Sequence, residues 1–134
     1  MVRARGWLAM CIEETPPFSY TIGLHSFGLP ELLVTGVWPE RGRALLNYFA
    51  EETMLSGPPA PGDRIELGPR ERIEVVEVDH PDAHMGIGLA LMGPEVRALQ
   101  LVWTDAFGRW PWHRDFNRAW GRQPVLGMRV PQNE

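Results

Sequence analysis

The chain has 134 residues, of which 44% are hydrophobic and 22% charged, and its formal net charge is −4. This composition is typical of a globular domain and excludes a disordered or fibrous chain. No apolar run approaches the roughly 20 residues that span a bilayer, and Glu13 and Glu14 interrupt what would be an apolar signal core near the N-terminus. We therefore expect a single cytoplasmic domain over residues 1–134, with no membrane contact.

The kinds of charged and sulfur-containing residues narrow the function further. All 13 basic residues are arginine, which together with 14 glycines and 13 prolines indicates the codon usage of a GC-rich bacterium. Because a basic footprint supplies most of the affinity for nucleic acid, the net negative charge argues against a nucleic-acid partner. Cys11 is the single cysteine, which excludes an internal disulfide and a cysteine-built zinc site.

The first half of the chain predicts two strands and a helix. Residues 18–24 alternate between apolar and polar side chains, as a half-buried strand does, and the apolar run 32–37 predicts a deeper strand. A helix is expected to begin at Pro39, which suits a first turn, and to end at Gly57. Its core-facing stripe is expected to comprise Ala44, Leu45, Tyr48 and Phe49. Residues 57–62 (Gly-Pro-Pro-Ala-Pro-Gly) then form a stiff connector inside the domain.

The second half adds further strands. Residues 64–67 and 72–79 alternate and predict two strands, with a bulge at Val75-Val76 where the alternation breaks. Residues 82–92 suit a helix, although two glycines there weaken it, and residues 97–103 predict another strand. Together these elements predict an α+β fold, in which two or three helices pack on one face of a mainly antiparallel sheet.

Residues 103–112 hold three tryptophans, an acid, an arginine, a glycine and a proline, so a specified local structure is expected there. Asp105 and Gly108 suit the first and last positions of a type I turn. Beyond this turn, two sets of residues recur every four positions, namely Arg114, Arg118 and Arg122, and Trp112, Phe116 and Trp120. Helical spacing would place an arginine face opposite an aromatic face. The segment is then either a surface helix or extended wrap docked on the sheet by its aromatic side, or a surface that binds an anion, a nucleic acid or a protein.

Three pieces of the chain, in this order, match one family pattern. They are residues 18–24 (Phe-Ser-Tyr-Thr-Ile-Gly-Leu) with Pro30-Glu31, Leu-Leu-Asn at 45–47, and the segment 99–112 with Gln123-Pro124 after it. On these residues the chain resembles the bacterial family called domain of unknown function 4262. Because that family has no assigned activity, the resemblance implies positions that matter but not their roles. The family commonly has an acid directly after the Pro-Trp pair, where this chain has His113.

One group of residues is our first candidate for a ligand site, provided that the strands carrying them are neighbours. The group comprises Tyr20, Thr21, Gln100, Asp105, Arg109 and Trp112. Arg109 suits a carboxylate or phosphate in a two-pronged contact, and Trp112 offers an aromatic wall. In the alternative interpretation, Asp105 closes its own turn, Arg109 pairs with Asp105, and the tryptophans fill the core.

The secondary candidates for the site are His25, Glu31 and His113. Tyr20, His25 and Glu31 could form an acid–base set, or each could make only structural contacts. His80 and His84 have the spacing of a helical metal chelate, but Pro81 lies between them and no third ligand follows, so we expect no metal.

Three classes of function remain open. The first is a binding or regulatory domain for an unknown small molecule or protein, and we prefer it because no nucleophile–base pair, metal cluster or phosphate loop is recognisable. The second is a small enzyme that uses acid–base chemistry on a polar metabolite, and the third is a protein–protein module built on the C-terminal tryptophans and arginines. The sequence names no cofactor, and a homodimer stays open.

Overall fold

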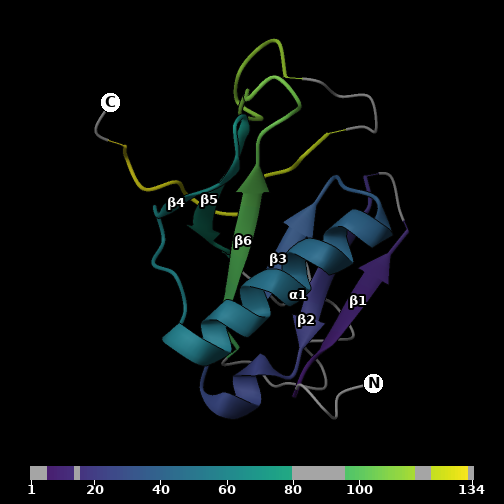
Figure 1. Ribbon diagram of the computed structural model, residues 1–134, viewed down its shortest axis with the longest axis vertical. Coiled ribbons are helices and arrows are strands. Elements are labelled where there is room, and N and C mark those ends of the chain that lie inside the picture. Colours follow the sequence, from purple (N-terminus) through teal and green to yellow (C-terminus); the bar gives the residue numbers. More distant parts are fainter. Residues whose placement is uncertain (1–5, 14–15, 80–95, 117–121, 133–134) are drawn as a thin grey trace.

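The computed structural model describes residues 6–13, 16–79, 96–116 and 122–132. In these residues, strands make one sheet and a single α-helix lies across it (Figure 1). The elements in chain order are β1 (Leu8–Ile12), β2 (Phe18–Ile22), the 3-10 helix η1 (Leu24–Phe27), β3 (Glu31–Thr35), α1 (Pro39–Ser56), β4 (Arg64–Gly68), β5 (Glu71–Glu77) and β6 (Ala98–Trp103).

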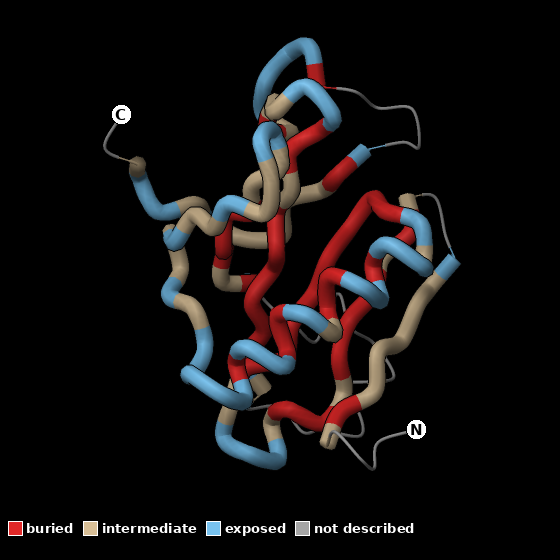
Figure 2. Tube along the Cα trace, viewed as in Figure 1, coloured by how far each residue is buried: buried red, intermediate tan, exposed pale blue. Residues whose placement is uncertain are grey.

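The sheet has the strand order β1-β2-β3-β6-β5-β4. The pair β3 and β6 is parallel, and the other neighbouring strands are antiparallel, so the α+β class and the mainly antiparallel sheet are confirmed. The central strands β3 and β6 are buried along almost their whole length, and Figure 2 shows this buried centre.

Helix α1 begins and ends where the sequence predicts. Pro39 occupies the first turn, and Gly57 follows the last turn with a φ of +88° while its N–H donates to the carbonyl of Thr53. The predicted stripe is partly wrong, because Ala44 and Tyr48 are exposed. The helix packs on β1, β2 and β3, and this orientation buries a stripe turned by about one residue. The buried residues of the stripe are Gly42, Leu45, Leu46, Phe49, Ala50 and Thr53.

Both faces of the sheet are covered. Leu32, Val34 and Leu99 pack under α1, whereas Tyr20, Leu33 and Ala98 form a cluster on the other face. Leu126, from the segment 122–132, packs against this second cluster. The C-terminal segment therefore covers part of the sheet face opposite α1.

Other expectations need correction. The first predicted strand ends at Ile22, because Gly23 has a φ of +130° and turns the chain into η1. The register of β5 and β6 runs without a break past Val75 and Val76, so the predicted bulge is wrong. Both valines are buried because β5 is covered on both faces. The sheet irregularity lies instead between Glu66 and Gly68, in β4.

The number of helices is also smaller than predicted over the described part of the chain. It contains one α-helix and one 3-10 helix rather than two or three helices. Residues 110–116 form successive turns, in which the N–H of His113 donates to the carbonyl of Trp110 and the N–H of Phe116 to that of His113. The helix predicted at 82–92 lies outside the described residues. No helix within the described ranges is long and apolar enough to cross a membrane.

Candidate functional site

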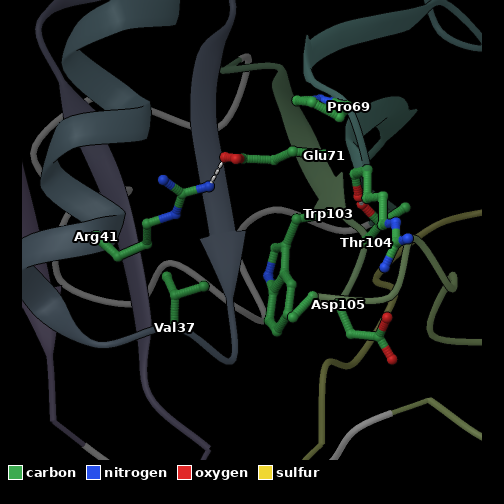
Figure 3. Close-up of a pocket in the computed structure, with 9 residues that line it drawn as sticks. Val37, Arg41, Pro69, Glu71, Trp103, Thr104 and Asp105 are labelled. Carbon is green, nitrogen blue, oxygen red and sulfur yellow. Dashed lines mark hydrogen bonds and ion pairs between the residues drawn. The ribbon is translucent and has the colours of Figure 1, made fainter.

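A pocket of about 340 Å³ opens where β6 ends, beside the first turn of α1. Figure 3 shows it between the helix and the turn that joins β4 to β5. Its volume falls within the range of roughly 300–1,000 Å³ that is usual for small-molecule sites. The residues that line it are Val37, Arg41, Pro69, Arg70, Glu71, Trp103, Thr104, Asp105 and Ala106.

The inner wall of this pocket is apolar and fixed in place. Val37 is buried, and the half-buried indole of Trp103 donates its Nε1–H to the carbonyl of Thr35 at 2.8 Å. Across the mouth, Arg41 of α1 forms an ion pair with Glu71 of β5 (Figure 3). The pocket thus combines an aromatic wall with charged groups at its rim.

Thr104 holds the β4–β5 turn against the loop after β6. Its hydroxyl donates to the carbonyl of Arg70 and accepts from the N–H of Arg72, both at 3.0 Å. Its own N–H donates to the carbonyl of Arg72 at 3.2 Å. These three bonds fix the position of the turn residues Pro69 and Arg70 relative to the wall made by β6.

Asp105 closes the predicted turn, since the N–H of Gly108 donates to its carbonyl at 3.0 Å. Its carboxylate Oδ1 accepts from the N–H groups of Phe107 and Arg109, and Oδ2 accepts from Arg109 Nε, each at 2.9 Å. Figure 3 shows this carboxylate pointing away from Trp103. Asp105, which lines the pocket, and Arg109, which does not, therefore hold this turn together. The engagement of both carboxylate oxygens argues against a role for Asp105 as a general base.

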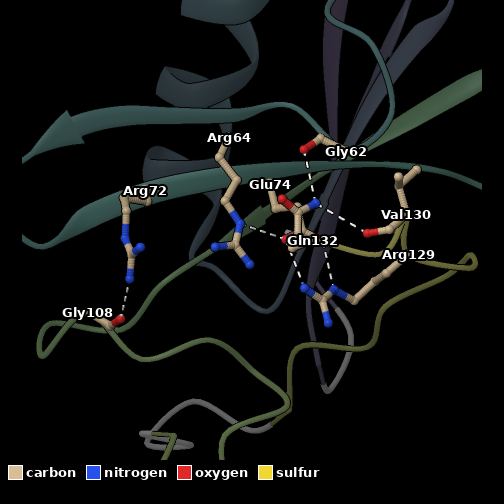
Figure 4. Close-up of polar contacts among 8 residues, drawn as sticks. All are labelled: Gly62, Arg64, Arg72, Glu74, Gly108, Arg129, Val130 and Gln132. Carbon is tan, nitrogen blue, oxygen red and sulfur yellow. Dashed lines mark hydrogen bonds and ion pairs between the residues drawn. The ribbon is translucent and has the colours of Figure 1, made fainter. Parts of the chain in front are cut away.

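Trp112 contacts the C-terminal segment through Arg129. Figure 4 shows that the guanidinium of Arg129 is held by the carboxylate of Glu74. Glu74 of β5 is fully buried and accepts from Arg64 Nε at 3.0 Å and from Arg129 Nε at 2.7 Å. The guanidinium of Arg129 lies 3.4 Å from the ring centroid of Trp112, and this ring stacks on Trp110 at 5.2 Å. Trp112 therefore helps to hold the loop after β6 rather than line the pocket.

Tyr20 and Gln100 lie on the sheet face opposite α1, with Leu33 between them in the register. Strands β2 and β6 are therefore separated by β3, and the condition for our first candidate site is not met. Gln100 Nε2 donates to the carbonyl of Pro124 at 2.7 Å, and its Oε1 accepts from the N–H of Leu126 at 2.8 Å. Through these bonds Gln100 anchors the C-terminal segment to β6.

Thr21 and His25 meet at a different buried carboxylate, that of Glu31. Its Oε1 accepts from Thr21 Oγ1 at 2.6 Å, and its Oε2 accepts from His25 Nδ1 at 2.7 Å. The backbone N–H groups of Gly23, Leu24 and His25 also donate to it, at 3.0 to 3.2 Å. Glu31 thus satisfies the start of η1 and orients the imidazole. Of the proposed acid–base set, His25 and Glu31 are in contact, while Tyr20 packs in the cluster with Leu33 and Ala98.

The remaining candidates are away from the pocket or beyond the described residues. His113 is exposed, and its Nδ1 accepts from the N–H of Asp115 at 3.1 Å. His80, His84, Arg118 and Trp120 lie outside the described residues. Within the described ranges, no cluster of three or more histidine, cysteine or acidic residues is suited to hold a metal ion.

Several of the residues that line the pocket were not identified as site residues from the sequence. Arg41, Arg70 and Glu71 come from a helix and a strand turn that carry no motif, and only the β4–β5 pairing and the helix packing bring them to Trp103. The short gap between the alternating segments 64–67 and 72–79, with Gly68 and Pro69 in it, is the one local signal of a tight turn at this place.

The family model described as Domain of unknown function (DUF4262) matches residues 1–117. No curated protein and no solved structure matches the chain. The matched range includes α1, the six strands and every residue that lines the pocket. Since the match covers most of the chain, the protein belongs to the DUF4262 family, as the order of its motifs indicated.

Proposed function

We propose that this protein is a small-molecule-binding domain, in a binding or regulatory role, and that the pocket at the end of β6 is its site. The observation that carries the proposal is the pocket itself, which joins the apolar surface of Val37 and Trp103 to charged groups at the rim. An apolar hollow with a few convergent polar groups is the usual form of a ligand site.

The contacts of the acidic groups favour binding over acid–base catalysis. Asp105 uses both carboxylate oxygens within its own turn, and Glu71 pairs with Arg41. Both carboxylates therefore already have partners, and neither is available as a general base beside the apolar wall of the pocket. His25, with its Nδ1 bound to Glu31, is not among the residues that line this pocket.

A fragment titration followed by ¹H–¹⁵N NMR tests the proposal. A set of neutral, anionic and cationic fragments is added to the protein, and the Nε1–H signal of Trp103 and the amide signals of Thr104 and Ala106 are followed. We expect at least one fragment to shift these signals in a saturable way.

Ala106→Trp should abolish that response, because Ala106 lines the pocket and a large ring there fills it. Ala44→Trp is the matched control, since Ala44 is exposed on α1 and does not line the pocket. Binding that is retained in Ala106→Trp, or no saturable shift with any fragment, would refute the proposed site.

A further inference from the structure

We infer that the ligand of this pocket is an organic monocarboxylate with a flat apolar body, and that Arg70 receives its carboxylate. This inference rests on the proposed function and adds the chemical class of the ligand and the residue that selects it. It is carried by the charges around the pocket and by which of them already have partners.

Most of the charged groups around the pocket are engaged. Arg41 pairs with Glu71, and Arg109 pairs with Asp105. Arg72, next to the lining residue Glu71, donates from its Nη2 to the carbonyl of Gly108 at 3.1 Å. The two carboxylates in the pocket lining, those of Glu71 and Asp105, are therefore both paired with an arginine.

Arg70 differs from these arginines. It is exposed and lines the pocket, and its guanidinium forms no hydrogen bond or ion pair with any other described residue. Its backbone is nonetheless fixed, because its carbonyl accepts from the hydroxyl of Thr104 at 3.0 Å and Pro69 before it has a restricted φ. Since Arg41 pairs with Glu71 and the neighbouring Arg109 pairs with Asp105, the positive charge of Arg70 is left uncompensated, and it is held on a well-positioned turn.

A guanidinium without a partner matches a carboxylate by two parallel N–H···O bonds, which an ammonium group cannot reproduce. The charge balance also limits the ligand. The carboxylate of Glu71 follows Arg70 directly in the chain and lines the same pocket. The second negative charge of a dianionic ligand would be repelled by this carboxylate. The single negative charge of a monocarboxylate is compensated by Arg70 alone. The indole of Trp103 and the side chain of Val37 provide the surface for a flat apolar body.

The test uses benzoate, its neutral isostere benzamide, and phenyl phosphate, each titrated at pH 7 into the full chain while the Trp103 Nε1–H signal is followed. We expect benzoate to bind more tightly than either of the other probes. In Arg70→Gln the Kd for benzoate should rise roughly ten- to a hundredfold, because a hydrogen bond to a charged group is lost. Arg70→Lys should weaken benzoate binding as well, because lysine keeps the positive charge but cannot form the two parallel N–H···O bonds of a guanidinium.

Arg114→Gln is the control, because Arg114 is exposed and lies outside the pocket lining. This substitution removes the same charge from the protein as Arg70→Gln. Its Kd for benzoate should equal that of the unmodified chain.

Equal binding of benzoate and benzamide, or an unchanged Kd in Arg70→Gln, overturns the inference while the proposed pocket stands. Tighter binding of phenyl phosphate overturns the assignment to monocarboxylates. Shifts from none of the three probes overturn the inference; if the wider fragment set also gives none, the proposed function fails with it.

Discussion

Replacing Asp105 by alanine should destabilise the fold by roughly 2–4 kcal/mol. Oδ1 accepts from two backbone N–H groups at 2.9 Å, and a hydrogen bond to a charged group contributes about 1.5–3 kcal/mol. Water can reach part of this loop, since Phe107 is 61% exposed, which lowers the sum. The ion pair to Arg109 adds no more than about 1 kcal/mol because the arginine side chain is 31% exposed.

Asp105→Asn separates the two contributions. The amide keeps an acceptor oxygen for the backbone N–H groups and loses the ion pair, so we expect a loss of about 1 kcal/mol or less. Urea unfolding of both variants measures the free energies, and a common m-value shows that the unfolded states are comparable. Asp115→Ala, at an exposed position, should stay within about 0.5 kcal/mol of the unmodified chain. The reasoning is refuted if alanine costs less than about 0.5 kcal/mol, or if asparagine costs as much as alanine.

Three further changes test other parts of the account. Glu31→Gln should cost roughly 3 kcal/mol in urea unfolding, because an amide cannot accept from all the donors around a fully buried carboxylate; a loss below about 0.5 kcal/mol contradicts this. Gly127→Ala should lower the melting temperature and expose the sheet face under the C-terminal segment to hydrogen exchange, because a Cβ there would lie 1.9 Å from the carbonyl oxygen of Glu77; unchanged exchange argues against that packing. The hydrogen bond from Arg97 lowers the pKa of Glu77 below its ordinary 4.5, so the pair stabilises the fold above that value and its contribution is lost as pH falls through the lowered pKa. In Arg97→Gln, a ¹³C titration should show the pKa of Glu77 returning upwards, with a stability loss at pH 7 below about 1 kcal/mol, and an unmoved pKa would refute the contact.

The fold was predictable where a local pattern settles the structure. Pro39 and Gly57 mark the ends of α1 because their backbone preferences act without help from distant residues. The turn closed by Asp105 and Gly108 follows from the same kind of local chemistry. Strand β1 was missed, since its five residues, Leu-Ala-Met-Cys-Ile, lack alternation between apolar and polar side chains.

The bulge at Val75-Val76 was wrongly predicted for a related reason. Two adjacent apolar residues break the alternation of a strand covered on one face, but they are expected in a strand covered on both faces. The segment 122–132, which packs against the second face, gave no signal of doing so in the sequence. Its anchors, such as Gln100 to Pro124 and Trp103 to Gln123, join positions 24 and 20 residues apart.

The candidate site was predictable only in part. The turn carrying Asp105 was identified, and its internal bonding was one of the two alternatives considered. The grouping with Tyr20 and Gln100 failed because β3 lies between β2 and β6, and strand order depends on the whole fold. Arg41 and Arg70 reach the pocket through helix packing and strand pairing, which no local pattern encodes.

Ligand binding in the pocket at the end of β6 is tested most sharply by a crystal structure of the protein soaked with benzoate. We expect ring density against Trp103 and Val37, with the carboxylate on the guanidinium of Arg70, and no such density in Ala106→Trp. Density for benzoate elsewhere on the molecule, with this pocket empty at concentrations that saturate the protein in solution, would contradict it.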